Sequence, residues 1–125
     1  MAIGVTRLGA VRIFVRDIAR ARQFYGETLD LPERIDGKDF SAFRVAGVDV
    51  VVETVSADQE SLAGRFAGVS FAVADIDAAV ADLRAAGVTI TGEPEKQIWG
   101  GIMAHIADPD RNEITLVEYP QETSA

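Results

Sequence analysis

The sequence predicts an α+β fold made of two βαβββ modules within a single domain, residues 1–125. The first observation is an internal repeat, because AVRIFVRDIARARQFY (10–25) matches GVSFAVADIDAAVADL (68–83) at a constant offset of 58 residues. The second is the alternation of apolar residues at the start of each copy, and the third is a series of short strand-like segments after each copy. With 48% hydrophobic residues, a chain of 125 residues can bury the core of one domain.

Each copy of the repeat is typical of a strand that runs into a helix. An aspartate follows each strand, Asp17 in the first copy and Asp75 in the second, where its carboxylate can accept from free backbone N–H groups of a helix. The second helix is expected to stop at Gly87, a residue suited to the position after a helix C-terminus. The strand residues that share one apolar side are Val11, Ile13, Val15, Val69, Phe71 and Val73.

Short strands separated by turns follow each helix and complete the modules. The clearest turn signals are Ala46-Gly47 in the first half and Asp108-Pro109-Asp110 in the second. We expect module one at about 7–55, a partly helical linker at 56–67, module two at 68–120 and a frayed tail at 121–125. The expected strands after the helices are 34–35, 40–45 and 48–55 in module one, and 89–90, 101–107 and 113–119 in module two.

The composition excludes several function classes. Twenty acidic against 12 basic residues give a net charge of −8, whereas a nucleic-acid-binding surface is basic. The chain has no apolar run of about 18 residues that would predict a membrane span, and its N-terminus does not resemble a secretion signal. The absence of cysteine excludes disulfides, cysteine-based zinc sites and thiol nucleophiles. We expect a cytoplasmic protein without nucleic-acid or membrane partners, whose negative charge favours solubility and would attract a cationic ligand.

Two motifs give the chain a family resemblance over residues 8–119. VRDIARARQFYGETLDL in the first module and DPDRNEITLVE at the end of the second resemble the vicinal oxygen chelate superfamily. This group includes glyoxalase I, extradiol dioxygenases, fosfomycin-resistance enzymes and bleomycin-resistance proteins. The resemblance implies a U-shaped, partly closed mixed sheet with helices outside, a small-molecule cleft inside the U, and a homodimer.

The resemblance also implies where a divalent metal would bind, and most of those positions lack a donor. The superfamily takes its ligands, commonly His, Gln or Glu, from four strand positions. They correspond here to Ala10, Glu53, Gly68 and Thr115, with Val51 as the alternative to Glu53. Alanine and glycine have no donor side chain, a threonine hydroxyl is a poor ligand, and a catalytic zinc needs about three protein ligands. We therefore expect neither a metal nor another cofactor.

The motif DPDRN departs from the resemblance at Arg111, where the superfamily usually has glycine. Residues other than glycine rarely adopt a positive φ. We expect either that the turn avoids a positive φ or that Asn112 takes the left-handed conformation.

Strand alternation predicts which side chains line the cleft. In WGGIMAHIADPD (99–110), one alternating set is apolar and suited to lie beneath the helices, namely Ile102, Ala104 and Ile106. The other set then faces the cleft, and facing residues of module one are expected to line the opposite half. The expected cleft residues are Trp99, Met103, His105, Phe40, Phe43, Glu53, Arg12, Phe14 and Ser70.

Three of these residues carry the chemical alternatives. His105, the one histidine of the chain, is a hydrogen-bonded strand residue, a ligand contact, or a general acid or base oriented by a carboxylate such as Glu53. It is not expected to ligate a metal, because it stands alone. Trp99 either packs or covers a planar ligand. Glu53 is a vestigial metal ligand, binds a cation, or lies at a solvated strand end.

Three functions remain open from the sequence. The first is a glyoxalase/bleomycin-resistance-like protein that binds a small aromatic or cationic molecule in a hydrophobic cleft without the metal. The second is a metal-independent lyase, isomerase or cyclase that uses His105 and Glu53 for proton transfer. The third is a metal-dependent glyoxalase or dioxygenase. The fold alone does not decide among them.

Overall fold

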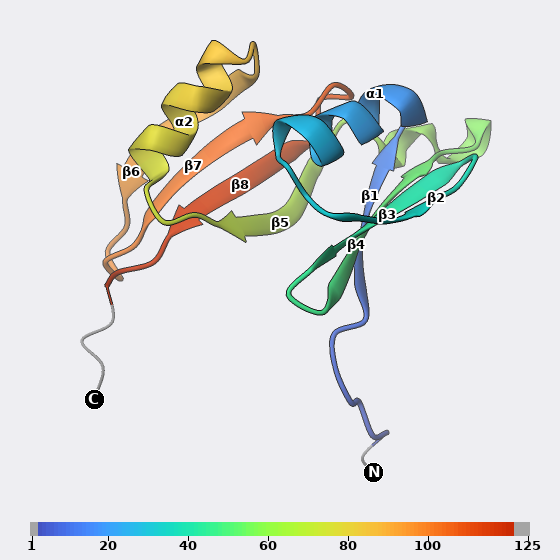
Figure 1. The fold of residues 1–125 in the computed structure, drawn as a ribbon, viewed down its shortest axis with the longest axis horizontal. Coiled ribbons are helices and arrows are strands. Elements are labelled where there is room, and N and C mark those ends of the chain that lie inside the picture. Colours follow the sequence, from blue (N-terminus) through green and yellow to red (C-terminus); the bar gives the residue numbers. More distant parts are fainter. Residues whose placement is uncertain (1–2, 122–125) are drawn as a thin grey trace.

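The computed structural model describes residues 3–121 and contains two four-stranded mixed sheets (Figure 1). The strand order is β1-β4-β3-β2 in the first sheet and β5-β8-β7-β6 in the second, and only β1·β4 and β5·β8 are parallel pairs. Module one contains β1 (Ala10–Val15), α1 (Ile18–Arg22), η1 (Gln23–Thr28), β2 (Glu33–Asp36), β3 (Phe40–Val45) and β4 (Val48–Thr54). Module two follows η2 (Ala57–Leu62) and contains β5 (Phe66–Ala72), α2 (Ile76–Ala85), β6 (Thr89–Lys96), β7 (Ile102–Ala107) and β8 (Glu113–Glu118).

The predicted α+β class and the repeated βαβββ order are confirmed, with differences at the element ends. β6 extends to Lys96 instead of stopping at Ile90, and β5 begins at Phe66, within the segment predicted as linker. Of the predicted tail, all but Gln121 lies outside the described residues. No helix within residues 3–121 is long and apolar enough to cross a membrane.

Side-chain caps start both helices as the sequence predicts. The Asp17 carboxylate accepts from the Arg20 backbone N–H at 3.1 Å, and the Asp75 carboxylate accepts from Ala78 N–H at the same distance. Helix α2 ends before Gly87, which has φ +87°. Helix α1 continues into the π-helical segment η1, which alternation and capping did not predict.

One apolar core extends through both modules, because each helix packs against one face of its own sheet and the two packed layers meet. Figure 1 shows α1 and α2 on the same side of the molecule. The largest fully buried apolar residues are Tyr25, Phe43, Ile13, Ile76, Ile106, Ile114, Val15 and Val52.

The turn between β7 and β8 joins the modules through buried polar contacts. The Asp108 carboxylate accepts from the Tyr25 hydroxyl at 2.7 Å and from Asn112 Nδ2 at 2.9 Å. The same Asn112 amide donates to the Phe14 carbonyl at 2.8 Å, and its oxygen accepts from the Gly64 N–H at 2.9 Å. Burial, reinforced by Asp108, raises the pKa of the Tyr25 phenol, so the hydroxyl stays protonated and donates. The turn therefore holds η1, β1 and the segment before β5 together.

Arg111, in this turn, has a φ of +73°, so both expectations for it were wrong. The arginine itself adopts the left-handed conformation in which a Cβ crowds the following carbonyl oxygen. Its backbone N–H donates to the Asp108 carbonyl at 2.9 Å, which closes the turn. Because buried hydrogen bonds fix Asp108 and Asn112, the strained conformation falls on Arg111, the residue just before Asn112.

We predict that Asn112→Ala destabilises the fold by about 2–4 kcal/mol, because it removes the amide that donates to the buried Asp108 carboxylate and the Phe14 carbonyl and accepts from the Gly64 N–H. Urea unfolding followed by circular dichroism measures the change. Gln59→Ala, an exposed change in η2, serves as the control. A loss of less than about 1 kcal/mol for Asn112→Ala would mean that the turn does not join the modules.

We also predict that Arg111→Gly stabilises the fold by about 1 kcal/mol, because glycine adopts the left-handed conformation without steric cost. The same urea experiment measures it. Arg84→Gly, within α2, is the opposite control and should destabilise by a similar amount. If Arg111→Gly lowered the free energy of unfolding, the claim that the positive φ destabilises the fold at Arg111 would be wrong.

Candidate functional site

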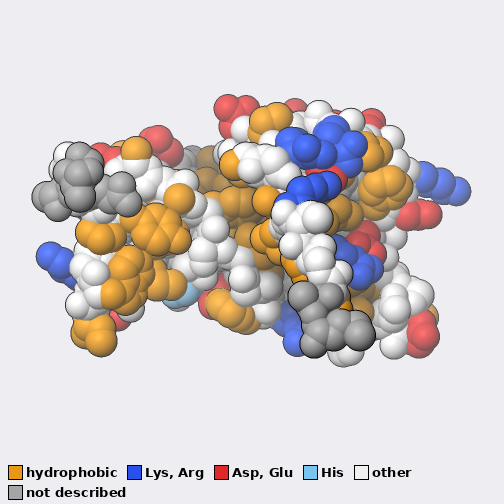
Figure 2. Space-filling model, turned by 90° about the horizontal axis from the view of Figure 1, so that it is seen from below, with side chains coloured by type: hydrophobic (Ala, Val, Ile, Leu, Met, Phe, Trp, Pro, Cys, Tyr) orange, Lys and Arg blue, Asp and Glu red, His pale blue; other side chains and the backbone are white. Residues whose placement is uncertain are grey.

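Each sheet has one face that the helices leave uncovered, which we call the open face. In the first sheet Ile13, Val52 and Phe43 point into the core, so the alternate residues of these strands lie on the open face. Figure 2, seen from below, shows hydrophobic side chains gathered over module two and charged side chains over module one. The open-face residues of the first sheet include Arg12, Phe14, Phe40, Arg44, Asp49, Val51 and Glu53.

Glu53 is bound by Arg12 on this face. Arg12 Nε and Nη2 donate to the two carboxylate oxygens at 2.7 and 2.8 Å, which is a bidentate ion pair. The hydrogen bonds from Arg12 lower the pKa of Glu53, so it is ionised at neutral pH. The guanidinium carbon also lies 5.2 Å from the centre of the Phe14 ring, within range of a cation–π contact.

A second cluster of charges lies around Asp49. Arg34 Nη2 and Arg44 Nε approach its carboxylate oxygens to 2.6 and 2.8 Å. These hydrogen bonds lower the pKa of Asp49 to about 2. The expectation of a hydrophobic cleft is therefore wrong for module one, whose open face carries ion pairs as well as aromatic rings.

The open face of module two is centred on His105. Its Nδ1 lies 3.0 Å from the Oγ1 of Thr115, its partner across the β7–β8 ladder, and 3.8 Å from a carboxylate oxygen of Glu113. On the other side β6 presents Gly92, where an added methyl group would lie 2.8 Å from the imidazole Cδ2. Met103 shares this face by strand alternation. The imidazole is about one-third exposed while Thr115 is buried, so the ring has a fixed orientation and an accessible edge.

His105 therefore lies on the face that alternation predicts, with Ala104 and Ile106 buried on the opposite one. The proposed pairing with Glu53 is wrong, because Arg12 holds Glu53 and neither residue hydrogen-bonds to the other. Glu113 is the carboxylate beside the imidazole.

Two aromatic residues differ from the expected arrangement. Phe43 is fully buried 6.4 Å from the Tyr25 ring, so its assignment to the cleft is wrong, whereas Phe40 is exposed on the open face. Trp99 is half exposed, and its indole lies over Gly101, with its ring centre 5.9 Å from that of Tyr119. Its described neighbours are at the end of the second sheet, away from the His105–Thr115 pair.

Comparison with known proteins identifies the family. The model of the Glyoxalase/Bleomycin resistance protein/Dioxygenase superfamily matches residues 7–116. The chain belongs to this superfamily. A superfamily member from Sphaerobacter thermophilus is 30% identical, with a TM-score of 0.77 over 92% of this chain and 98% of that one. The antibiotic-binding protein TnmS3 from a Streptomyces species is 26% identical, with a TM-score of 0.77 over 96% and 100% of the two chains. The uncharacterised protein YraH of Bacillus subtilis is 26% identical over 88% of this chain and 96% of its own length.

The strand register identifies the fourth position of the superfamily's metal site. In module two Thr115 pairs with Ser70, and the 58-residue repeat makes Arg12 the counterpart of Ser70. Arg12 pairs with Val51, so Val51 and not Glu53 is the counterpart of Thr115.

The residues at the superfamily's metal positions do not fit a divalent cation. With Val51 in place of Glu53, the set becomes Ala10, Val51, Gly68 and Thr115, in which only a threonine hydroxyl has a donor atom. Within residues 3–121 no three His, Cys, Asp or Glu side chains lie close enough together to hold an ion. At Thr115, a position where the superfamily has a metal-ligating residue, this chain instead has a hydrogen bond between a hydroxyl and the His105 imidazole.

Glu113 and Gly92 are the site residues that sequence reasoning missed. The turn from Asp108 to Asn112 fixes the β7–β8 register, which places Thr115 opposite His105 and Glu113 opposite Ala107. A hairpin assignment from this turn alone would have found Thr115 and Glu113. Gly92 could not be found in this way, because irregular pairing between β6 and β7 shifts the register on both sides of it.

Proposed function

We propose that the protein is a cytoplasmic homodimer that binds a small organic molecule on its open faces without a divalent metal. The observation that carries the proposal is the His105–Thr115 hydrogen bond, which stands where a metal-binding relative would have a ligand. A hydroxyl and an imidazole in this arrangement can donate to or accept from a polar group of a ligand. The antibiotic-binding activity in the name of TnmS3, 26% identical to this chain, supports binding as the function.

The chemistry of the open faces favours an aromatic ligand with polar or cationic groups. Module two offers the imidazole edge of His105 and the thioether of Met103, with the half-exposed indole of Trp99 further along. Module one offers Phe14 and Phe40 beside ion pairs that already neutralise one another. Flat apolar groups can stack on the rings, and the net charge of −8 attracts a cation.

Exposed apolar side chains on the described surface support a dimer. Phe66 is 60% exposed, Trp99 49% and Tyr119 61%. A second copy related by two-fold symmetry would cover such residues and enclose the open faces. We predict a particle of twice the 13.4 kDa chain mass in sedimentation velocity at micromolar concentration. A monomer under these conditions would contradict this part of the proposal.

The single histidine allows a direct test of binding. In protein treated with EDTA, the imidazole C–H resonances report on His105 alone, and fluorescence reports on Trp99, the only tryptophan. Titration with a panel of aromatic cations, including bleomycin without metal, should shift the imidazole resonances in a saturable way with at least one compound. Failure of every compound to shift them, or shifts that require added metal, would contradict the proposal.

We predict that His105→Ala weakens binding of such a compound by about 1–3 kcal/mol, because one hydrogen bond from the site is lost. Isothermal titration measures the change. The fold should remain intact, since the ring is partly exposed and its removal opens no core cavity. Lys38→Ala, a change in the exposed loop before β3, is the control. Unchanged affinity in His105→Ala would remove His105 from the site.

We predict that elemental analysis of the purified protein finds no stoichiometric divalent metal, because Ala10, Val51 and Gly68 provide no donor atoms. Thr115→Glu restores one carboxylate and should still not suffice, since zinc sites use about three protein ligands. The prediction would be wrong if the protein contained about one zinc, nickel, manganese or iron per chain and a chelator removed both the metal and ligand binding.

A metal-independent lyase, isomerase or cyclase is the second candidate. The observation that favours it is the carboxylate of Glu113, 3.8 Å from His105 Nδ1, because a carboxylate near an imidazole can support proton transfer. Conversion of a bound compound by the wild-type protein, lost in both His105→Ala and Glu113→Gln, would establish this activity. Binding without conversion supports the first proposal.

A further inference from the structure

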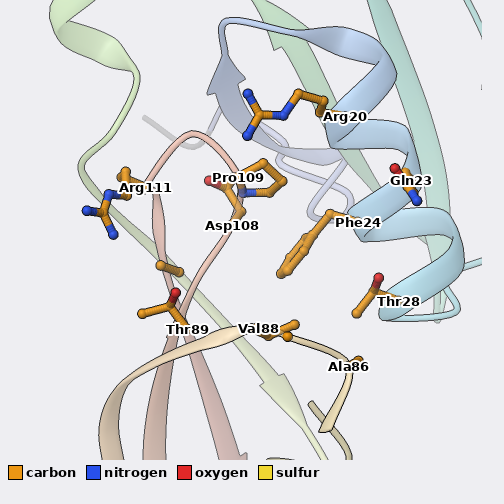
Figure 3. A pocket seen from close by; sticks show the side chains of 12 residues that line it. Arg20, Gln23, Phe24, Thr28, Ala86, Val88, Thr89, Asp108, Pro109 and Arg111 are labelled. Atoms are coloured by element: carbon orange, nitrogen blue, oxygen red, sulfur yellow. The ribbon is translucent and has the colours of Figure 1, made fainter. Parts of the chain in front are cut away.

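A second cavity lies between the modules and shares no residue with the candidate site. Its volume is about 460 Å³, within the range of small-molecule pockets. Figure 3 shows three walls: α1 and η1, the segment that leads from α2 into β6, and the β7–β8 turn. The side chains shown include Arg20, Gln23, Phe24, Thr28, Val88, Thr89, Asp108, Pro109 and Arg111.

Two guanidinium groups of this groove form no direct ion pair with a described carboxylate, although the charge of Arg20 acts on the nearby buried carboxylate of Asp110. Arg20 belongs to the α1 wall and Arg111 to the turn, and neither side chain forms a hydrogen bond or ion pair with another described residue. Six other arginines of the chain are paired with carboxylates: Arg12, Arg16, Arg22, Arg34, Arg44 and Arg84. Among the described residues Arg7 and Arg65 also lack a carboxylate partner, so Arg20 and Arg111 are distinguished by lining one groove.

Asp108, the acidic residue of the wall, does not neutralise them. One of its oxygens accepts from the Asp110 and Asn112 backbone N–H groups at 2.9 and 2.8 Å. The other accepts from the Tyr25 hydroxyl and the Asn112 amide. All four bonds are internal, so the carboxylate is part of the buried turn and Arg20 and Arg111 remain available to a ligand.

The buried contacts of the turn set the backbone conformation of Arg111, which lies on the groove wall. A positive φ is strained for arginine and free for glycine, yet the chain has arginine at this position. Backbone strain that the surrounding structure holds in place is frequent at functional sites. Here the strain accompanies a guanidinium on the groove wall.

We propose that this groove binds a small organic anion, with its phosphate or carboxylate group attracted by Arg20 and Arg111 and its apolar part beside Phe24. Guanidinium groups match the geometry of these anions and can bind them through two hydrogen bonds. Figure 3 shows the Phe24 ring directed into the groove, with Val88 and Pro109 nearby to contact an apolar ligand body. Gln23, Thr28 and Thr89 can bond to further polar groups.

The test compares phenyl phosphate with phenol, which has the same ring without the charge. Isothermal titration and amide NMR are run on the wild type, Arg111→Gly, Arg20→Gln and the control Arg84→Gln, whose arginine lies outside the groove. The wild type and Arg84→Gln should bind phenyl phosphate with similar affinity. Both should bind phenol about ten-fold more weakly than phenyl phosphate, or weaker still. Arg111→Gly and Arg20→Gln should each weaken phenyl phosphate binding by about ten-fold or more. Benzoate in place of phenyl phosphate shows whether a carboxylate suffices.

Several results would overturn the proposal. The first is that the wild type does not bind phenyl phosphate. The second is that Arg111→Gly and Arg20→Gln bind it as tightly as the wild type does. The third is that the wild type binds phenol as tightly as phenyl phosphate. Shifts confined to His105 would place the anion on the open face and also count against it. We expect Arg111→Gly to keep the fold, and its urea unfolding midpoint checks this. Lost binding in a folded Arg111→Gly protein then results from the loss of the guanidinium group. Because His105 is outside the groove, this result is independent of the binding proposed for the open faces.

Discussion

The buried carboxylate of Asp108 is the group on which the joining of the two modules depends. It is 3% exposed, and an ion at that depth is tolerated only when its oxygens are satisfied. Tyr25 of η1, the Asn112 amide and the backbone of the turn supply the donors, so the charge cannot be accommodated unless η1 and the turn are together. The same turn fixes the β7–β8 register, which places Thr115 beside His105.

The motif that identifies the superfamily is therefore mainly structural in this chain. In DPDRNEITLVE, Asp108 and Asn112 tie the modules together, and Glu118 accepts from the Ile76 backbone N–H at the start of α2 at 2.9 Å. These roles hold whatever ligand is bound. Thr115 stands within the same motif at a metal position, where its side chain bonds to His105. Membership of the superfamily thus settles the fold and leaves the chemistry to single side chains.

The sequence predicted the elements well, and the side-chain partners less well. Alternation placed His105 correctly, because the apolar residues on either side of it mark one buried face. Phe40 and Phe43 are three positions apart and must lie on opposite faces, but Ser41, Ala42 and Phe43 are all buried, so burial in β3 does not alternate. The Arg12–Glu53 pair depends on the parallel β1–β4 register, across 41 residues, which local pattern does not supply. The left-handed Arg111 follows from buried contacts that no local rule contains.

The central claim is that the open faces bind a small molecule through side chains alone. Native mass spectrometry of protein isolated from the producing cells in the presence of a chelator tests it most directly. The account predicts a two-chain species that carries an organic molecule and no metal, and the same molecule should be absent or depleted on His105→Ala protein from the same cells. An assembly whose bound mass includes one divalent ion per chain, or an organic ligand retained equally by His105→Ala, would contradict it.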